Sequence, residues 1–184
     1  GQHSHSIYVF KDYQVVYSYR DFGPLIMNDH DLPEGYIVCH QQAPTTDNKN
    51  IESIHPAQIG PNLLWHNGII KEDFVKKLQK DLESTNTWDT KLLLQHLIYY
   101  EEPAKIDGTF SCIWFDGYEM MVFRNEISPL FYDKEMNISS TKFDNSESLA
   151  PNIIHFLTYN EDLKLTLTEG PTFETVENPY YFGG

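Results

Sequence analysis

The polar side chains that could do chemistry gather between residues 40 and 68, around the ends of two expected strands. A long polar segment, residues 41–62, joins these strand ends and is interrupted by prolines. Irregular segments of this length in a compact domain are more often functional than idle. The region contains His40, Gln41, Gln42, Thr45, Thr46, His55, His66 and Asn67. We therefore expect a binding or catalytic site in this part of the chain.

Asn67 and Gly68 carry the most specific chemistry of this region, because they directly follow the apolar run 63–66. A side-chain amide beside a glycine N–H supplies two hydrogen-bond donors on a rigid element, as an oxyanion hole requires. Glycine also lacks the Cβ that would keep a reacting carbonyl away. Asn-Gly is equally a common turn sequence, so both an oxyanion hole and a plain turn remain open.

Other site chemistries find little support in the sequence. A metal site would have to pair His55 with His66 or His40, yet no Cys/His pair stands at ligand spacing. We therefore expect no metal and no cofactor, and interpret His40 and His66 as hydrogen-bonding residues at strand ends. Glycine-rich phosphate loops and a Gly-x-Ser-x-Gly elbow are also absent, which argues against kinases, dehydrogenases and serine hydrolases.

The charge balance narrows the class of partner. The 184 residues include 13 Lys+Arg and 27 Asp+Glu, which gives a formal net charge of −14. Nucleic acids and anionic membranes attract Lys and Arg, so neither is expected as a partner. No apolar run approaches the ~18 residues of a membrane span, so we expect a soluble, cytoplasmic protein. Small molecules and other proteins remain as partners.

The composition predicts one folded domain. With 40% hydrophobic and 14% aromatic residues, the chain can bury a core. We expect residues 7–184 to form this domain, and residues 1–6, which lack a starting Met, to be an added or processed end. Cys39 and Cys112 stand in apolar runs, and we expect both to be buried, reduced thiols rather than a disulfide.

Hydropathy patterns predict two helices between groups of strands. Apolar residues at helical spacing predict a helix over 71–82 and a second one, capped by Thr87 or Asp89, that runs to about Glu102. Runs of β-branched and aromatic residues predict a hairpin and further strands over 7–10, 14–19, 35–40, 63–66, 109–115, 119–124, 129–132, 137–140, 153–157 and 164–168. Two layers of sheet combined with helices fit this order.

Several motifs in this order resemble class II glutamine amidotransferase domains. LLWHNGIIKEDFVKKL (63–78) resembles their hydrophobic strand followed by His-Asn-Gly-Ile-Ile. IHPAQ (54–58) resembles the Ala-His-Pro segment before that strand, and TWDTKLLLQHLI (87–98) resembles the following Ser-Asp-Thr-Glu helix start. DGTFSCIWFDG (107–117) and MVFRNEISPLFY (121–132) resemble a strand pair that ends in Arg and Ser-Pro-Leu. The order of the motifs is more specific than any one of them.

This resemblance implies an α+β fold: a four-layer αββα sandwich of two stacked, mainly antiparallel sheets, as in N-terminal nucleophile hydrolases. In that family a Cys at the first position attacks the side-chain amide of glutamine, and its own α-amine acts as the base. By motif match, Asn67 and the Gly68 N–H would hold the oxyanion, and Asp89 would meet the α-ammonium of glutamine. The other substrate-binding candidates are Gln42, Thr45 and His66.

Two positions depart from the pattern of the family. His5 stands where the nucleophilic Cys is expected, so no nucleophile is visible in the sequence. Gln42 stands where the family usually has an Arg that binds the α-carboxylate of glutamine. An amide cannot form that bidentate charge pair. Arg20 is a candidate replacement.

Three functions remain open at this point. The first is an amidohydrolase that acts on glutamine or a related amide and supplies ammonia to a separate synthase or acceptor protein. The second is a catalytically inactive relative that binds a ligand or regulates a protein partner. The third is a structural subunit in which residues 66–68 form a plain turn.

Overall fold

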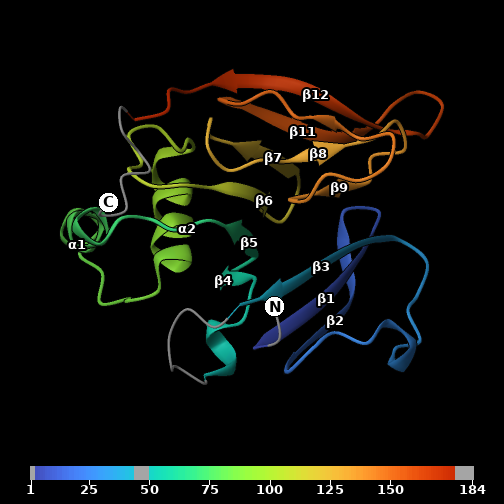
Figure 1. The fold of residues 1–184 in the computed structure, drawn as a ribbon, viewed down its shortest axis with the longest axis horizontal. Coiled ribbons are helices and arrows are strands. Elements are labelled where there is room, and N and C mark those ends of the chain that lie inside the picture. The colour runs from blue at the N-terminus through green and yellow to red at the C-terminus, as the bar shows by residue number, and fades with distance from the viewer. Residues whose placement is uncertain (1–2, 44–49, 177–184) are drawn as a thin grey trace.

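The computed structural model describes residues 3–43 and 50–176. Within these residues the chain forms three antiparallel sheets and two α-helices (Figure 1). Neither helix is long and apolar enough to cross a membrane. The candidate residue Thr45 lies outside the described residues.

A three-stranded antiparallel sheet forms from the first part of the chain. Its strands are β1 (Ser4–Lys11), β2 (Gln14–Phe22) and β3 (Tyr36–Gln42), in the order β2-β1-β3. The predicted hairpin is confirmed, but β1 extends back to Ser4, so residues 4–6 belong to the sheet. Because β1 is the central strand, it is buried from Ser4 to Phe10.

A six-stranded antiparallel sheet forms from the later strands, in the order β12-β11-β7-β6-β5-β4. The predicted strands agree with it, apart from the short edge strand β4, which lies inside the segment expected to be irregular. The bounds are β4 (Ala57–Ile59), β5 (Asn62–Asn67), β6 (Ser111–Phe115), β7 (Met120–Arg124), β11 (Ile153–Tyr159) and β12 (Leu165–Thr172). A small third sheet contains β8 (Phe131–Tyr132), β9 (Ile138–Ser139) and β10 (Glu147–Ser148).

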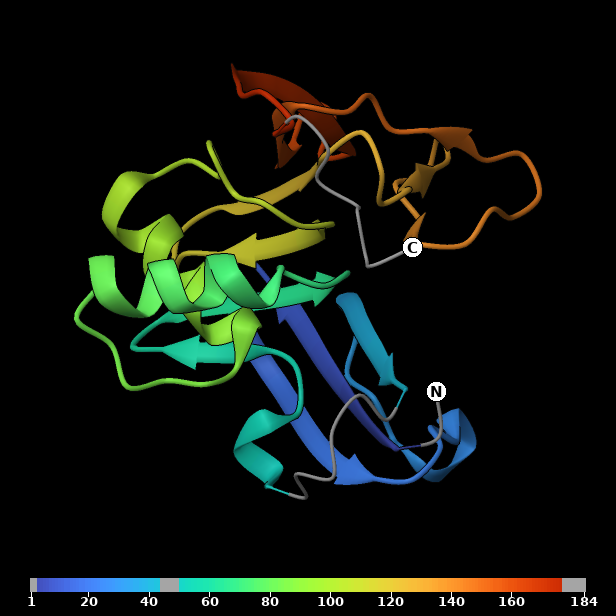
Figure 2. The same ribbon diagram turned by 60° about the vertical axis from the view of Figure 1, so that its left-hand side comes forward.

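Both predicted helices are present and lie against one face of the six-stranded sheet. They are α1 (Glu72–Asp81) and α2 (Asp89–Tyr100), and two short 3-10 turns occupy Met27–Asp29 and Ile51–Ser53. In α2 the leucines at 92, 93, 94 and 97 are fully buried and pack with the sheet in one core. Figure 2 shows the two helices together beside the strands of this sheet.

The opposite face of the six-stranded sheet packs on the three-stranded sheet. Tyr8, Phe10 and Val38 from one sheet meet Leu63 and Trp65 from the other in a second core. Successive side chains of a strand point to opposite faces, so Leu64 and His66 of β5 face the helices instead.

The architecture is the expected α+β sandwich of stacked antiparallel sheets. Of the four layers of the αββα arrangement, the described residues contain three, because both α-helices lie on the six-stranded sheet. The outer face of the three-stranded sheet carries exposed Ile37 and Cys39.

The expectation that both cysteines are buried was wrong for Cys39. Both thiols are free, but only Cys112 is buried. Cys39 pairs with Ile7 in the β1–β3 register, on the face of the sheet that turns away from the core. The apolar run around Cys39 does not reveal this, because in an outer sheet every second residue of a strand points away from the inter-sheet core.

Candidate active site

A buried polar network centres on the hydroxyl of Thr90, in the first turn of α2. Thr90 Oγ1 lies 3.1 Å from His66 Nδ1 and 3.2 Å from His55 Nε2. The other ring nitrogen of His66, Nε2, lies 3.0 Å from the carbonyl oxygen of Thr109. The network therefore joins β5, α2 and the segment before β4.

The hydrogen-bond partners determine which ring nitrogen of His66 carries the proton. His66 must donate from Nε2 to the Thr109 carbonyl, so its Nδ1 accepts when the ring is neutral. The Thr90 hydroxyl, which carries one proton, lies within hydrogen-bond reach of both His66 Nδ1 and His55 Nε2. His55 Nδ1 lies 3.2 Å from the side-chain oxygen of Gln42, so His55 donates from this nitrogen to that oxygen.

His40 and His55 are held neutral beside one another. Their rings stack with centroids 4.0 Å apart and an interplanar angle of 24°. Burial lowers the pKa of His40 to about 4, and repulsion from His66 acts in the same direction. Burial also lowers the pKa of His55 well below its ordinary value, with His40 as the next cause. Two neutral rings can stack without the repulsion that two imidazolium ions would suffer.

The N-terminal end of β1 borders this network. Ser6 pairs with Arg20 on β2 and His40 on β3, and its hydroxyl is fully buried with no hydrogen-bond partner in the described part of the chain. Arg20 donates from Nε to the hydroxyl of Tyr8 and from Nη1 to the carbonyl of Ile54, at 2.9 and 3.1 Å. Among the described residues no carboxylate pairs with Arg20. A guanidinium therefore lies beside Ser6 with part of its donor capacity unused.

The peptide bond between Asn67 and Gly68 is anchored through hydrogen bonds to its carbonyl oxygen. The hydroxyls of Ser111 and Ser128 donate to the Asn67 carbonyl oxygen at 3.4 and 3.2 Å. In a trans peptide the N–H points away from the carbonyl, so the Gly68 N–H is turned to the opposite side. That N–H and the Asn67 side-chain amide make no hydrogen bond with any residue the structure describes, and both residues are exposed.

The conformation of Gly68 explains why glycine stands at this position. Its φ is +138°, and a Cβ would collide with the carbonyl of Thr109. Glycine is thus required by close packing against residue 109, in addition to any access it gives a ligand. The side chain of Asn67 continues the face of Trp65 on β5, which faces the three-stranded sheet.

The structure places the other sequence candidates in different surroundings. Asp89 accepts from the backbone N–H groups of Ile70 and Thr90 at 3.1 and 2.8 Å, so it links α2 to the segment after β5. His66 is buried with both ring nitrogens bonded within the protein. Gln42 lies beside His55, and the Ser4 hydroxyl reaches it at 3.5 Å.

His5, the position expected to hold the nucleophile, lies on the other face of β1 from Ser4 and Ser6. Its Nδ1 lies 2.9 Å from the carbonyl oxygen of Gly23, and its ring stacks on Tyr19 with centroids 5.9 Å apart. Strand alternation therefore separates it from the polar network.

Among the described residues, neither cysteine thiol reaches the core-facing side of β1. Cys39 is on the outer face of β3, and Cys112 is buried opposite His66 in the β5–β6 register. Burial raises the pKa of both thiols, that of Cys112 strongly. Within the same residues, no group of three or more His, Cys, Asp and Glu side chains is placed to hold a metal ion.

Sequence reasoning missed the bridging role of Thr90 and the inner position of Ser6. Thr90 follows Asp89 at the start of a predicted helix, which is where side chains turn toward the end of a neighbouring sheet. Ser6 was assigned to the end of the chain rather than to a strand. Alternation from the apolar Tyr8 and Phe10 could have placed it on the inner face.

Comparison with known proteins connects this arrangement to one fold. No protein-family model matches the chain, and no curated protein matches it either. Among solved structures, the glutamine phosphoribosylpyrophosphate amidotransferase of B. subtilis matches with a TM-score of 0.65 and 15% identity, over 92% of this chain and 43% of that one. A structure described as the allosteric regulatory enzyme of purine biosynthesis matches with a TM-score of 0.66 and 16% identity, over the same shares.

A third solved structure has a length close to that of this chain. It is a glutamine aminotransferase class-II domain protein from Silicibacter pomeroyi, with a TM-score of 0.57 and 14% identity, and the match covers 91% of this chain and 92% of that one. The first two matches span less than half the length of the enzymes concerned. Identities this low establish the fold alone. The chain thus has the fold of class II glutamine amidotransferase domains, within the N-terminal nucleophile hydrolase architecture.

Proposed function

We propose that this domain binds a glutamine-like primary amide at the end of β5 and hydrolyses it, releasing ammonia for a separate acceptor protein. One observation carries the proposal: two serine hydroxyls anchor the Asn67–Gly68 peptide, and its N–H and the Asn67 side-chain amide have no hydrogen-bond partner among the described residues. A peptide N–H held in this way does not have to reorient when an attacked carbonyl becomes an oxyanion. The fold supports the same chemistry, because the solved structures named as amidotransferases share it.

The reaction adds water across the amide, so that the C–N bond breaks and the nitrogen leaves as ammonia. Asn67 and Gly68 stabilise the negative oxygen that forms during the attack. By resemblance, the nucleophile belongs near the start of β1, at the position that His5 occupies in this chain. The neutral network of His40, His55 and Thr90 holds this end of the three-stranded sheet against α2.

A second function, amide binding without turnover, is favoured by the position of the thiols. Cys39 and Cys112 both lie away from the inner face of β1, and burial raises both pKa values, which disfavours the nucleophilic thiolate. A domain of this kind would present an amide-binding cleft to a ligand or a protein partner and would release no ammonia.

The test measures binding and turnover separately, with glutamine and a set of small primary amides. Ammonia release is followed by a coupled assay, and binding is followed through the NMR signals of the Gly68 N–H and the Asn67 side-chain amide. For an active domain, Asn67→Ala lowers kcat about 100-fold or more. The exposed amide of Asn137 provides the matched control, because it bonds Asp133 outside the candidate site, and we expect Asn137→Ala to leave kcat unchanged.

Each outcome decides between the two functions. Turnover that depends on Asn67 supports hydrolysis. Saturable shifts at Asn67 and Gly68 without ammonia release support the binding function and contradict hydrolysis. Absence of both, across the set of amides, contradicts both functions.

A further inference from the structure

The two large sheets differ in what covers their outer faces. The helices α1 and α2 lie on the six-stranded sheet. On the three-stranded sheet, no α-helix of the described residues covers the outer face, and the segment between β2 and β3, residues 23–35, packs on part of it. His30 of this segment meets the ring of Tyr19 edge to face, with centroids 4.7 Å apart, and its Nδ1 lies 3.0 Å from the hydroxyl of Tyr17. The rest of this face is open to solvent.

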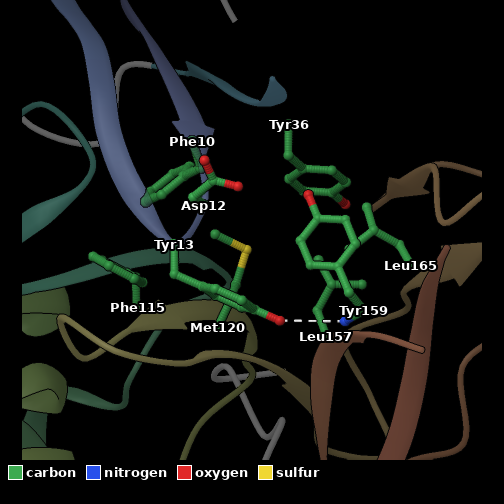
Figure 3. A pocket seen from close by; sticks show the side chains of 9 residues that line it. All are labelled: Phe10, Asp12, Tyr13, Tyr36, Phe115, Met120, Leu157, Tyr159 and Leu165. Carbon is green, nitrogen blue, oxygen red and sulfur yellow. Dashed lines mark hydrogen bonds between the residues drawn. The ribbon is translucent and has the colours of Figure 1, made fainter. Parts of the chain in front are cut away.

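The inner face of the three-stranded sheet is held against the six-stranded sheet. Figure 3 shows the rings of Phe10 and Tyr36 beside Met120, which belongs to the other sheet, and these side chains share one core. The Tyr13 hydroxyl accepts the backbone N–H of Tyr159 at 3.2 Å, which ties the β1–β2 turn to β11. The three-stranded sheet is therefore fixed from within, and its outer face is the side that a partner can approach.

Exposed apolar side chains concentrate in this layer of the molecule. Seven of the fifteen large apolar side chains that are exposed in residues 3–43 and 50–176 belong to residues 15–37. Tyr19 and Ile37 stand on the outer face of the sheet, and Ile26 and Met27 stand on the segment that packs on it; their exposed fractions lie between 37% and 53%. Gathered apolar, aromatic and methionine side chains of this kind are typical of protein–protein interfaces.

The charges around this apolar face are mainly negative. Residues 3–43 contain five carboxylates and two cations. Of the two cations, Arg20 faces the inner side of the sheet and Lys11 stands at the β1–β2 turn. The Tyr19 hydroxyl donates to Asp21 at 2.9 Å; this bond raises the pKa of Tyr19, and the charge of Asp29 acts in the same direction. Carboxylates therefore lie beside the exposed apolar side chains, where they favour a cationic partner.

We propose that this outer face binds an amphipathic helix of a partner protein, with Lys or Arg residues beside the apolar side of the helix. The central strand β1 is bonded to a neighbour on each side, so the face presents side chains rather than free backbone groups. A segment that lies on it must satisfy its own backbone hydrogen bonds, as a helix does. A second copy of the chain would bring its own charge of −14 to an acidic surface, which disfavours self-association. The proposal does not depend on amide hydrolysis at Asn67.

A synthetic peptide with leucine and lysine in the order of an amphipathic helix is the probe, and the same peptide with glutamate in place of lysine is its control. Binding is read from the methyl NMR signals of Met27 and Ile37. A second readout is the rate at which uncharged iodoacetamide alkylates Cys39, which is exposed on the same face as Ile37. We expect saturable shifts with a Kd of about 1–100 μM, alkylation slowed about fivefold or more at saturation, and at least about tenfold weaker binding of the glutamate peptide.

Matched variants separate this face from the rest of the acidic surface. Ile37→Ser and Met27→Ser are each expected to weaken binding about threefold or more, while Ile98→Ser, at a similarly exposed residue of α2, leaves it unchanged. Asp29→Asn is expected to weaken binding more than Asp144→Asn, an equal charge change at an exposed residue outside residues 3–43.

Several results would overturn the proposal. One is a set of shifts spread over the acidic surface without protection of Cys39, which indicates attraction by net charge alone. Another is equal binding of the lysine and glutamate peptides, or an equal effect of Ile37→Ser, Met27→Ser and Ile98→Ser. A third is a dimer, seen by sedimentation, that protects Cys39 in the absence of peptide, because the occupant would then be a second copy of the chain.

Discussion

The substitution Thr90→Val tests whether the buried histidines depend on one hydroxyl. Thr90 is 1% exposed, and its hydroxyl lies within 3.2 Å of ring nitrogens of both His55 and His66. Valine has nearly the same shape, so the side chain fills the same space. Only the hydrogen bonds are removed, and the two ring nitrogens stay buried without this partner.

The size of the effect follows from the number of groups left unpaired. A buried polar group without a partner costs about 1–3 kcal/mol, so the loss at two ring nitrogens lowers the free energy of unfolding by about 3 kcal/mol. For a domain of this length, each kcal/mol corresponds to a shift in Tm of about 2–4 °C. Thr90→Val therefore lowers Tm by about 6–12 °C.

Thr90→Ser is the matched variant, because it keeps the hydroxyl and removes one buried methyl. This change costs about 1 kcal/mol. Urea unfolding of both variants, followed by circular dichroism, measures the difference. If hydrophobic packing controls this position, serine is the more damaging substitution. A larger loss for Thr90→Ser than for Thr90→Val would refute the hydrogen-bond network.

Three further predictions follow from the same structure. Because the pKa values of His40 and His55 are lowered in the folded state, the unfolded chain binds more protons below pH 6.5. The contribution of these two histidines to stability is therefore complete above about pH 6.5 and is lost as the pH falls below it, down to about pH 4 for His40, by up to about 1.4 kcal/mol per pH unit for each histidine. Urea midpoints at several pH values measure this loss. Gly68→Ala, whose Cβ would collide with backbone, is expected to lower the urea midpoint much more than Gly60→Ala, where φ is +56° but the space is open; equal losses contradict the packing account. Cys39 is expected to react with a thiol reagent in the native protein, while the second thiol reacts only in denaturant; two equivalents under native conditions would show that the core opens.

Much of the fold follows from local patterns in the sequence. Two patterns predict most of the helices and strands. One is the helical spacing of apolar residues such as Leu78 and its neighbours, and the other is the aromatic runs of the strands. The folded structure contains both kinds of element. The strand β4 was not predicted, because the three residues Ala57–Ile59 are too few to show alternation. Its existence depends on pairing with β5.

The composition of the candidate site was only partly predictable. Asn67 and Gly68 were identified from their chemistry, and the grouping of His40 with His55 follows from the strand ends. Which face each residue occupies is set by register, and a shift of one position reverses it. The outer position of His5 and the inner position of Ser6 were therefore not predicted, although alternation from Tyr8 was a signal for both.

The central claim is that the Gly68 N–H and the Asn67 side-chain amide donate together to the carbonyl oxygen of an amide. A ¹⁵N NMR titration of the protein with glutamine tests it most directly, using a backbone label at Gly68 and a side-chain label at Asn67. We predict that both signals shift together and saturate with a single dissociation constant, and that Asn67→Ala weakens the shift at Gly68. Saturable shifts at other residues, with these two signals unmoved, would contradict the claim.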